Sequence, residues 1–284
     1  QWDGVVISDW GAVHDTHTAI IGGLDMEFGS WTDGLTEGTS NAYDNYWLAN
    51  SYLKGIKEGI YTDKELNEKV RRVLRLTFRT AMNNDRPWGS MVSDAHKTAC
   101  RKIGEEGIVL LQNNANLLPI NLSKVKRIAV IGENAIKMMT VGGGSSSLKV
   151  KYEVTPLEGL QNLLDGKARI EYAPGYQLSK KAYKVGHWFT NEFDKFDEEL
   201  YKKAINTAAQ AELVIYIGGT SHEHGSDCEG YDKPNLKLPY QQDRLLKGIL
   251  EVNPNTVVVL ISGGPVEIGE WYYEDIKKDK KFLG

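Results

Sequence analysis

The chain has 284 residues, of which 41 % are apolar and 25 % charged, and its formal net charge is −4. This composition is close to the average of globular domains, which excludes a disordered chain. No cluster of Lys and Arg is interleaved with aromatic residues, so we do not expect nucleic acid as a partner. The sequence also lacks an apolar run of about 18 residues, so no membrane-spanning helix is expected.

The two ends of the sequence indicate a piece of a longer protein. Residues 1–3 lead directly into an apolar run at 5–7, without an initiator Met or a leader segment. The charge run at 277–281 ends the pattern without a closing strand, so we expect the chain to be truncated at its C-terminus as well. Cys100 and Cys228 are expected to be ordinary thiols, with a disulfide as the alternative.

The first 80 residues alternate between short apolar runs and helical patterns. The clearest helix begins at Thr62, because Thr62 and Glu65 fit a capping box, which satisfies orphan amide groups at a helix start. Alternation of this kind suits an α/β barrel or a doubly wound sheet. The other elements predicted here are strands at 5–8 and 24–28 and helices at 14–22 and 43–58.

The alternation restarts after a polar stretch at 83–93, which reads as an interdomain linker. A helix is predicted at 94–111. The pattern then predicts strands at 128–131, 213–217 and 257–261 and helices at 156–164, 197–210 and 239–250. Such a parallel α/β layer binds its ligands beyond the carboxyl ends of the strands.

Two segments carry carboxyl groups in positions suited to catalysis. Asp9 follows a buried-type strand, as catalytic side chains of barrels do, although an Asp there can also cap the next helix. The loop after the strand at 213–217 concentrates acidic residues, and a solvated acidic loop is the alternative. Together the two segments supply the ionised carboxylate and the protonated carboxyl that glycoside hydrolysis needs.

A series of motifs follows in order along nearly the whole chain. They are 4–12 (GVVISDWGA), 23–27 (GLDME), 108–113 (IVLLQN), 117–119 (LLP), 128–132 (IAVIG), 143–146 (GGSS), 155–160 (TPLEGL) and 229–233 (EGYDK). The set resembles the family 3 β-glucosidases. The resemblance implies a (β/α)₈ barrel followed by an α/β sandwich domain, with the active site between them. Residues 1–82 would be the end of the barrel, 83–93 the linker and 94–284 the incomplete sandwich domain.

The resemblance also implies the roles of single residues. Asp9 matches the nucleophile, Trp10 an aromatic residue bordering the sugar site, and Glu229 the acid/base, with Glu223 as the reserve candidate. The family usually has Arg where this chain has Lys233, which keeps the charge and loses the planar fork. The implied mechanism is retaining, with the two carboxyl groups about 5–5.5 Å apart.

The expected function is hydrolysis of β-D-glucosidic bonds, releasing terminal glucose from oligosaccharides or glucosides. A β-xylosidase, another β-glycosidase of the family and a non-catalytic sugar-binding or structural module are the alternatives. A β-N-acetylhexosaminidase is disfavoured, because those relatives often use a barrel-loop His as acid/base and lack the second domain. The barrel strands that grip the sugar are missing here, so the chain alone is expected to be inactive. No cofactor is expected, the oligomeric state is open, and the resemblance favours a secreted or periplasmic protein.

Three further features admit more than one interpretation. The glycine-rich stretch 142–147 lacks the Gly-Lys-Ser/Thr of a phosphate-binding P-loop. The cluster at 222–228 contains two His, an Asp and a Cys, but a solvated loop is expected there rather than a metal site. Asp25 and Glu27 end a predicted strand, and either substrate contact or a structural role in closing the barrel is open.

Overall fold

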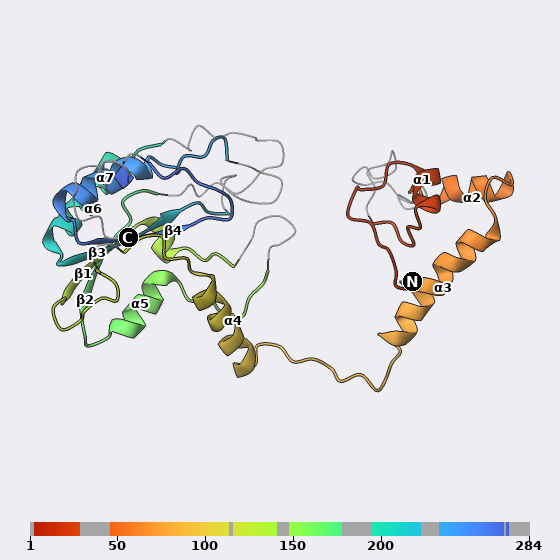
Figure 1. The fold of residues 1–284 in the computed structure, drawn as a ribbon, viewed down its shortest axis with the longest axis horizontal. Helices are drawn as coiled ribbons and strands as arrows, with labels where there is room; N and C mark the ends of the chain where they lie inside the picture. Colours follow the sequence, from red (N-terminus) through yellow and green to blue (C-terminus); the bar gives the residue numbers. More distant parts are fainter. Residues whose placement is uncertain are drawn as a thin grey trace. The chain divides into compact units, whose positions relative to one another are not determined.

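The computed structural model describes residues 3–28, 46–113, 116–140, 148–177, 195–222, 233–269 and 271–272. The chain divides into two compact units, Gln1–Met91 and Val92–Gly284, each with its own elements (Figure 1). The assignment of 1–82 to a barrel end, 83–93 to a linker and 94–284 to a sandwich domain stays a prediction. None of the helices in the described ranges has the length and apolar character needed to cross a bilayer.

The first unit contains three described helices, α1 (Thr16–Ile21), α2 (Asn50–Lys57) and α3 (Asp63–Arg79). The capping box predicted at the start of α3 is confirmed: the Thr62 hydroxyl accepts a hydrogen bond from the backbone of the first turn, and the Glu65 carboxylate accepts one from the Thr62 amide. Apolar side chains of α3 are largely exposed at positions four residues apart, which are Leu66, Val70, Leu74 and Phe78. We call these four residues the α3 stripe.

The strands predicted at 5–8 and 24–28 are only partly correct. In the described residues of this unit the two segments run in parallel and meet at a single bridge between Ile7 and Met26. The amide groups of Asp25 and Met26 both donate to the carbonyl of Val6, at 2.9 and 3.1 Å. One carbonyl shared by two consecutive amides is incompatible with a regular ladder, so the pairing stays short.

The second unit begins with α4 (Asp94–Gly107), whose residues are all exposed. The helix predicted to reach 111 ends four residues earlier, because Ile108 takes an extended conformation. The elements that follow are β1 (Arg127–Ile131), the 3₁₀ helix η2 (Glu133–Ile136), α5 (Pro156–Leu164), β2 (Arg169–Ala173), α6 (Glu198–Gln210), β3 (Leu213–Gly219), α7 (Gln242–Val252) and β4 (Thr256–Ile261).

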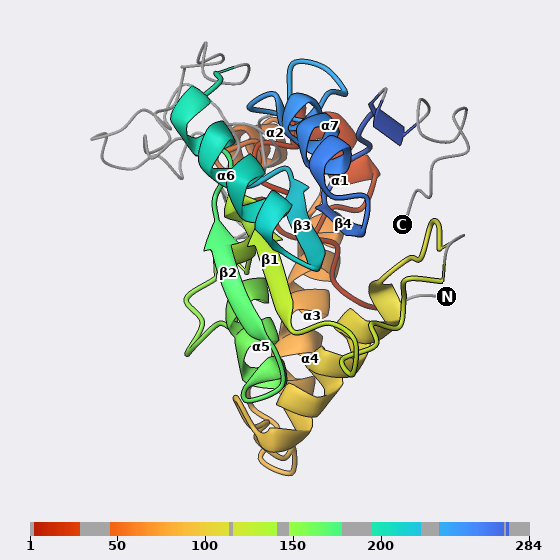
Figure 2. The same ribbon diagram turned by 90° about the vertical axis from the view of Figure 1, so that its left-hand side faces the viewer.

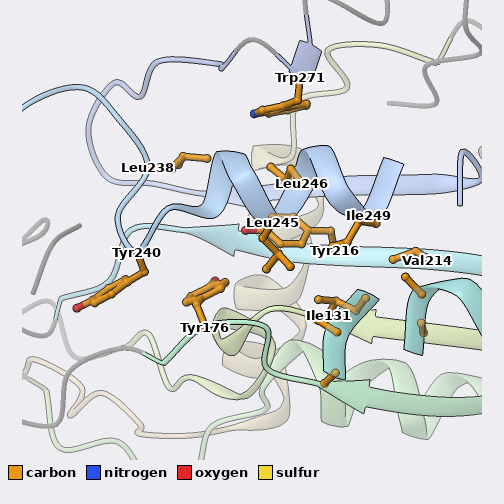
Figure 3. Packing of buried hydrophobic residues seen from close by; sticks show 14 residues of the cluster. Ile131, Tyr176, Val214, Tyr216, Leu238, Tyr240, Leu245, Leu246, Ile249 and Trp271 are labelled. Atoms are coloured by element: carbon orange, nitrogen blue, oxygen red, sulfur yellow. The ribbon is translucent and has the colours of Figure 1, made fainter. Parts of the chain in front are cut away.

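The described strands form a four-stranded parallel sheet in the order β2-β1-β3-β4. The α/β fold with a parallel sheet is therefore confirmed. Helices α6 and α7 cover one face of the sheet and α5 the other (Figure 2). Alternate residues of each strand enter different cores, as Ile131 and Tyr216 do on the α6–α7 face (Figure 3) and Val130 and Ile215 on the α5 face.

The strand order places a topological switch between β1 and β3. The chain passes from β1 through α5 to β2 at one edge, then returns through α6 to β3 on the other side of β1. Ligands of open α/β sheets bind beyond the carboxyl ends of the strands at such a point. The segments that lie there are 132–136, after β1, and 220–222, after β3.

Candidate active site

Asp9 is exposed at the end of the segment that pairs with Met26. Its Oδ1 accepts a hydrogen bond from the amide of Trp10 at 2.7 Å, and its carbonyl accepts one from Ala12 at 3.3 Å. The alternative that Asp9 caps the next helix is wrong. The residue that caps α1 is Asp15, whose Oδ1 lies 2.6 Å from the amide of Thr18. The Asp9 carboxylate is therefore left at the surface by the helix that follows it.

Trp10 presents its indole beside this carboxylate. The ring is 67 % exposed, although Trp is a large apolar side chain that folding normally buries. It stacks on Phe28, with ring centroids 5.4 Å apart and an interplanar angle of 28°. The Phe28 amide in turn donates to the Ser8 hydroxyl at 2.8 Å. The stacked pair therefore holds one indole face in a fixed place, as an aromatic platform for a sugar ring would require.

Asp25 supports the backbone around Asp9 from within the protein. Its side chain is 2 % exposed, lies 3.7 Å from the Arg72 guanidinium of α3, and accepts a hydrogen bond from the Val6 amide at 2.9 Å. Lys69 of α3 donates to the carbonyl of Leu24 next to it. Burial lowers the pKa of Lys69, and the Asp25 carboxylate opposes that shift. These contacts favour the structural role of Asp25.

Glu27 has a structural role as well. Its two carboxylate oxygens accept hydrogen bonds from the backbone amides of Trp47 and Leu48, at 3.2 and 2.7 Å. The carboxylate thus anchors the chain that leads into α2. A groove of about 510 Å³ in this unit is lined by residues that include Ser8, His14 and Asp15, whereas Asp9 and Trp10 lie outside that lining.

The predicted acid/base lies beyond the end of β3. Glu229 and the reserve candidate Glu223 are outside the described residues, as are Gly142 to Ser147 and most of the candidate metal cluster, of which His222 alone is described. The chain enters that segment from Thr220 and Ser221, which are buried, and leaves it at Lys233. The Lys233 ammonium donates to the carbonyl of Pro265, a backbone contact that needs no planar fork.

Two buried amide side chains hold the chain where it leaves β3, and the sequence analysis missed both. Gln242, the first residue of α7, accepts from the Gly219 amide at 2.9 Å and donates to the Gly219 carbonyl at 2.8 Å. Asn134, in η2, donates to the Thr220 carbonyl at 2.8 Å. Both side chains are 0 % exposed. A lone Asn or Gln has no period or spacing, so only its position after a strand end could have drawn attention to it.

Two tyrosines complete this polar network. Tyr176 donates to Asn134 Oδ1 at 2.5 Å, and Tyr216 donates to Gln242 Oε1 at 2.7 Å. Burial raises the pKa of both phenols, so they stay protonated and act as donors. Tyr176 also stacks on Tyr240, with ring centroids 6.2 Å apart (Figure 3). The network thereby fixes which way each amide points.

The family of the chain follows from its second unit. Residues 108–278 match the family described as Glycosyl hydrolase family 3 C-terminal domain, which is more than half of the chain. The chain belongs to glycosyl hydrolase family 3. The ordered motifs of the sequence predicted this family.

Relatives of this family 3 chain include proteins named as β-glucosidases. It is 42 % identical to Beta-glucosidase BoGH3A of Bacteroides ovatus over 94 % of this chain and 36 % of that protein. It is 31 % identical to Thermostable beta-glucosidase B of Acetivibrio thermocellus over 94 % of this chain and 32 % of that protein. The chain therefore spans about a third of the length of these curated relatives.

A solved structure shares the fold. The GH3 β-glucosidase of Bifidobacterium adolescentis superposes with a TM-score of 0.71 at 27 % identity, covering 95 % of this chain and 34 % of that one. A relative from Formosa agariphila that is 27 % identical is named Beta-xylosidase, and it covers 94 % of this chain. Names within the family thus differ in the sugar.

Proposed function

We propose that this chain is part of a retaining β-glucosidase in which Asp9 is the nucleophile and Glu229 the acid/base. The observation that supports this most directly is the exposed Asp9 carboxylate beside the exposed, stacked indole of Trp10. The helix that follows does not use this carboxylate as its cap, because Asp15 fills that role. The two most similar relatives reported above are both named β-glucosidases, which supports glucose as the sugar.

The proposed reaction has two steps. Asp9 attacks the anomeric carbon and forms an ester, while Glu229 gives its proton to the oxygen of the departing alcohol. Glu229, now a carboxylate, then removes a proton from water as the water oxygen attacks the same carbon and releases Asp9. The configuration at carbon is inverted twice and so retained. Trp10 would stack on the sugar bordering the cleaved bond.

The longer protein is part of the proposal. We propose that Asp9 belongs to the end of a (β/α)₈ barrel and Glu229 to an α/β sandwich domain. The chain covers about a third of the length of these two relatives. We propose that the side chains of the other barrel strands, which would bind the sugar, lie outside the chain. Hence we expect the isolated chain to be inactive and the full-length enzyme to be active. Hydrolysis of an aryl β-glucoside by the isolated chain at the full-length rate would contradict this.

The nucleophile is tested by trapping in the full-length enzyme. A 2-deoxy-2-fluoro-β-glucoside with a dinitrophenolate leaving group forms the ester quickly, and its fluorine slows the hydrolysis of that ester. We expect one sugar on the peptide that carries Asp9, detected by mass spectrometry, and no labelling of Asp9→Asn. The matched control is Asp15→Asn, an exposed carboxylate of the same unit, which should be labelled like the parent.

Other results would point to other functions. Labelling of a different carboxylate would refute the role of Asp9. Absence of labelling with intact sugar binding would support the non-catalytic module. The name of the Formosa agariphila relative favours the β-xylosidase as the second candidate. A ratio of kcat/KM for aryl β-xyloside over aryl β-glucoside above one would establish it for this enzyme.

A further inference from the structure

Gly219 and Thr220, at the end of β3, make hydrogen bonds through all of their polar backbone groups. Gln242 holds both the amide and the carbonyl of Gly219. The Thr220 amide donates to the carbonyl of Ile261 at 2.9 Å, and the Thr220 carbonyl accepts from Asn134. All four polar backbone groups of these two residues therefore have named partners. Two of the three partners are side chains, which come from different elements, η2 and α7.

This arrangement is more specific than the strand end needs. A buried polar side chain is costly unless its hydrogen bonds are made, and apolar residues would fill the same volume. Asn134 and Gln242 are both fully buried, and each is aligned by its own tyrosine hydroxyl. A satisfied buried network rigidifies and specifies one arrangement. The arrangement specified here is the position and direction in which the chain leaves the sheet.

We propose that Asn134 and Gln242 are positioning residues, which set the reach of the acid/base by fixing Gly219 and Thr220. This inference rests on the proposed function, in which Glu229 protonates the departing oxygen. Glu229 follows Thr220 by nine residues in the sequence. Proton transfer needs the acid within hydrogen-bond reach of that oxygen. A misplacement of about 1 Å can cost on the order of 10²-fold in rate. A shift at Thr220 therefore slows the acid-dependent step without touching the nucleophile.

The chain offers a matched control in Asn253. Its side chain is also buried, and its Nδ2 donates to the carbonyls of Ala208 and Ala211 at 2.9 and 3.0 Å. These bonds join the end of α7 to the end of α6, near the amino ends of β3 and β4, whereas Thr220 follows the carboxyl end of β3. Asn253→Leu thus removes a buried amide by the same chemistry as Asn134→Leu, but far from the exit of β3.

The experiment compares two substrates in the full-length enzyme. A methyl β-glucoside needs a proton on its leaving oxygen, whereas a 2,4-dinitrophenyl β-glucoside does not, and kcat/KM reports the first chemical step for both. For Asn134→Leu and Gln242→Met we expect kcat/KM on the methyl glucoside to fall about tenfold or more beyond the fall on the dinitrophenyl glucoside. For Asn253→Leu we expect a lower Tm and the same fall on both substrates.

Milder changes guard against variants that do not fold. Tyr176→Phe removes the hydroxyl that orients Asn134 and keeps the ring, so it should show the same split to a smaller degree. Equal loss on both substrates in every folded variant would overturn the positioning role and leave the proposed function standing. A parent enzyme that hydrolyses neither substrate would instead refute the proposed function, and with it this inference.

Discussion

Gly219 offers the sharpest test of how closely β3 and β4 approach. It has φ of +124°, and a Cβ placed on it would lie 1.9 Å from the carbonyl oxygen of Ile261 and 2.7 Å from the carbonyl carbon. The obstacle is backbone, which cannot rotate away as a side chain can. That same oxygen accepts the Thr220 amide at 2.9 Å. Gly219→Ala must therefore part the two strands by more than an ångström and break this hydrogen bond.

The magnitude follows from three contributions. The backbone conformation costs an Ala about 1–3 kcal/mol, the forced separation about 1–3 kcal/mol, and the lost hydrogen bond about 1 kcal/mol. Strain and separation relieve one another in part, so we expect a loss of about 3–5 kcal/mol. For a unit of this size that lowers Tm by roughly 10 °C. Scanning calorimetry of the chain, with urea unfolding followed by fluorescence, measures it.

Gly166 is the matched control. Its φ is +67°, and a Cβ there would meet nothing within 4 Å. Gly166→Ala therefore keeps only the cost of a left-handed backbone, about 1–2 kcal/mol. The two variants should differ by about 2 kcal/mol or more. Equal losses would show that close approach at Gly219 has no energetic effect and would refute the reasoning.

Two further perturbations test buried charges. Burial raises the pKa of Asp243, so between the unfolded-state and folded-state pKa values the folded protein binds a proton that the unfolded chain has lost. Stability therefore falls as pH rises above about 4. Asp243→Asn, which can still accept from the Trp271 indole, should raise Tm at pH 7 and have little effect at pH 3.5; a greater gain at low pH would contradict this. Arg72→Met leaves the buried carboxylate of Asp25 without its guanidinium partner, so it should lower the free energy of unfolding, measured in urea, by about 3 kcal/mol. The control is Arg71→Met, on the exposed side of α3, which should leave that free energy unchanged.

Elements with strong local signals could be predicted to within a residue or two. Helix α5 begins at the predicted residue because Thr155 caps it and Pro156 fits its first turn. Strand β3 is buried along its whole length, so its sequence is a continuous apolar run. Strand β2 (Arg169–Ala173) was missed although charged and apolar residues alternate in it, and although Ile170 and Tyr172 pack against the core on the α5 face. The alternation covers only four residues, so it is a much weaker signal than the continuous apolar run of β3.

The candidate site also has residues that the sequence could predict and residues that it could not. Asp9 and Trp10 stand next to one another in sequence, and their exposure agrees with the predicted roles without testing them. Asn134 and Gln242 are 108 positions apart, and they converge on Thr220 and on Gly219, the last residue of β3, only when the sheet forms. Such a convergence depends on strand order and register, which a single sequence does not specify.

The α3 stripe has a practical consequence for work with this chain by itself. Four apolar side chains in succession face water along one helix, and exposed patches of this kind drive proteins to stick to one another. Solutions of the isolated chain should therefore bind hydrophobic dyes. At high concentration they should sediment as a mixture of monomers and oligomers. Detergent below its micelle concentration, or Lys in place of Val70 and Leu74, would be the first remedy in the purification.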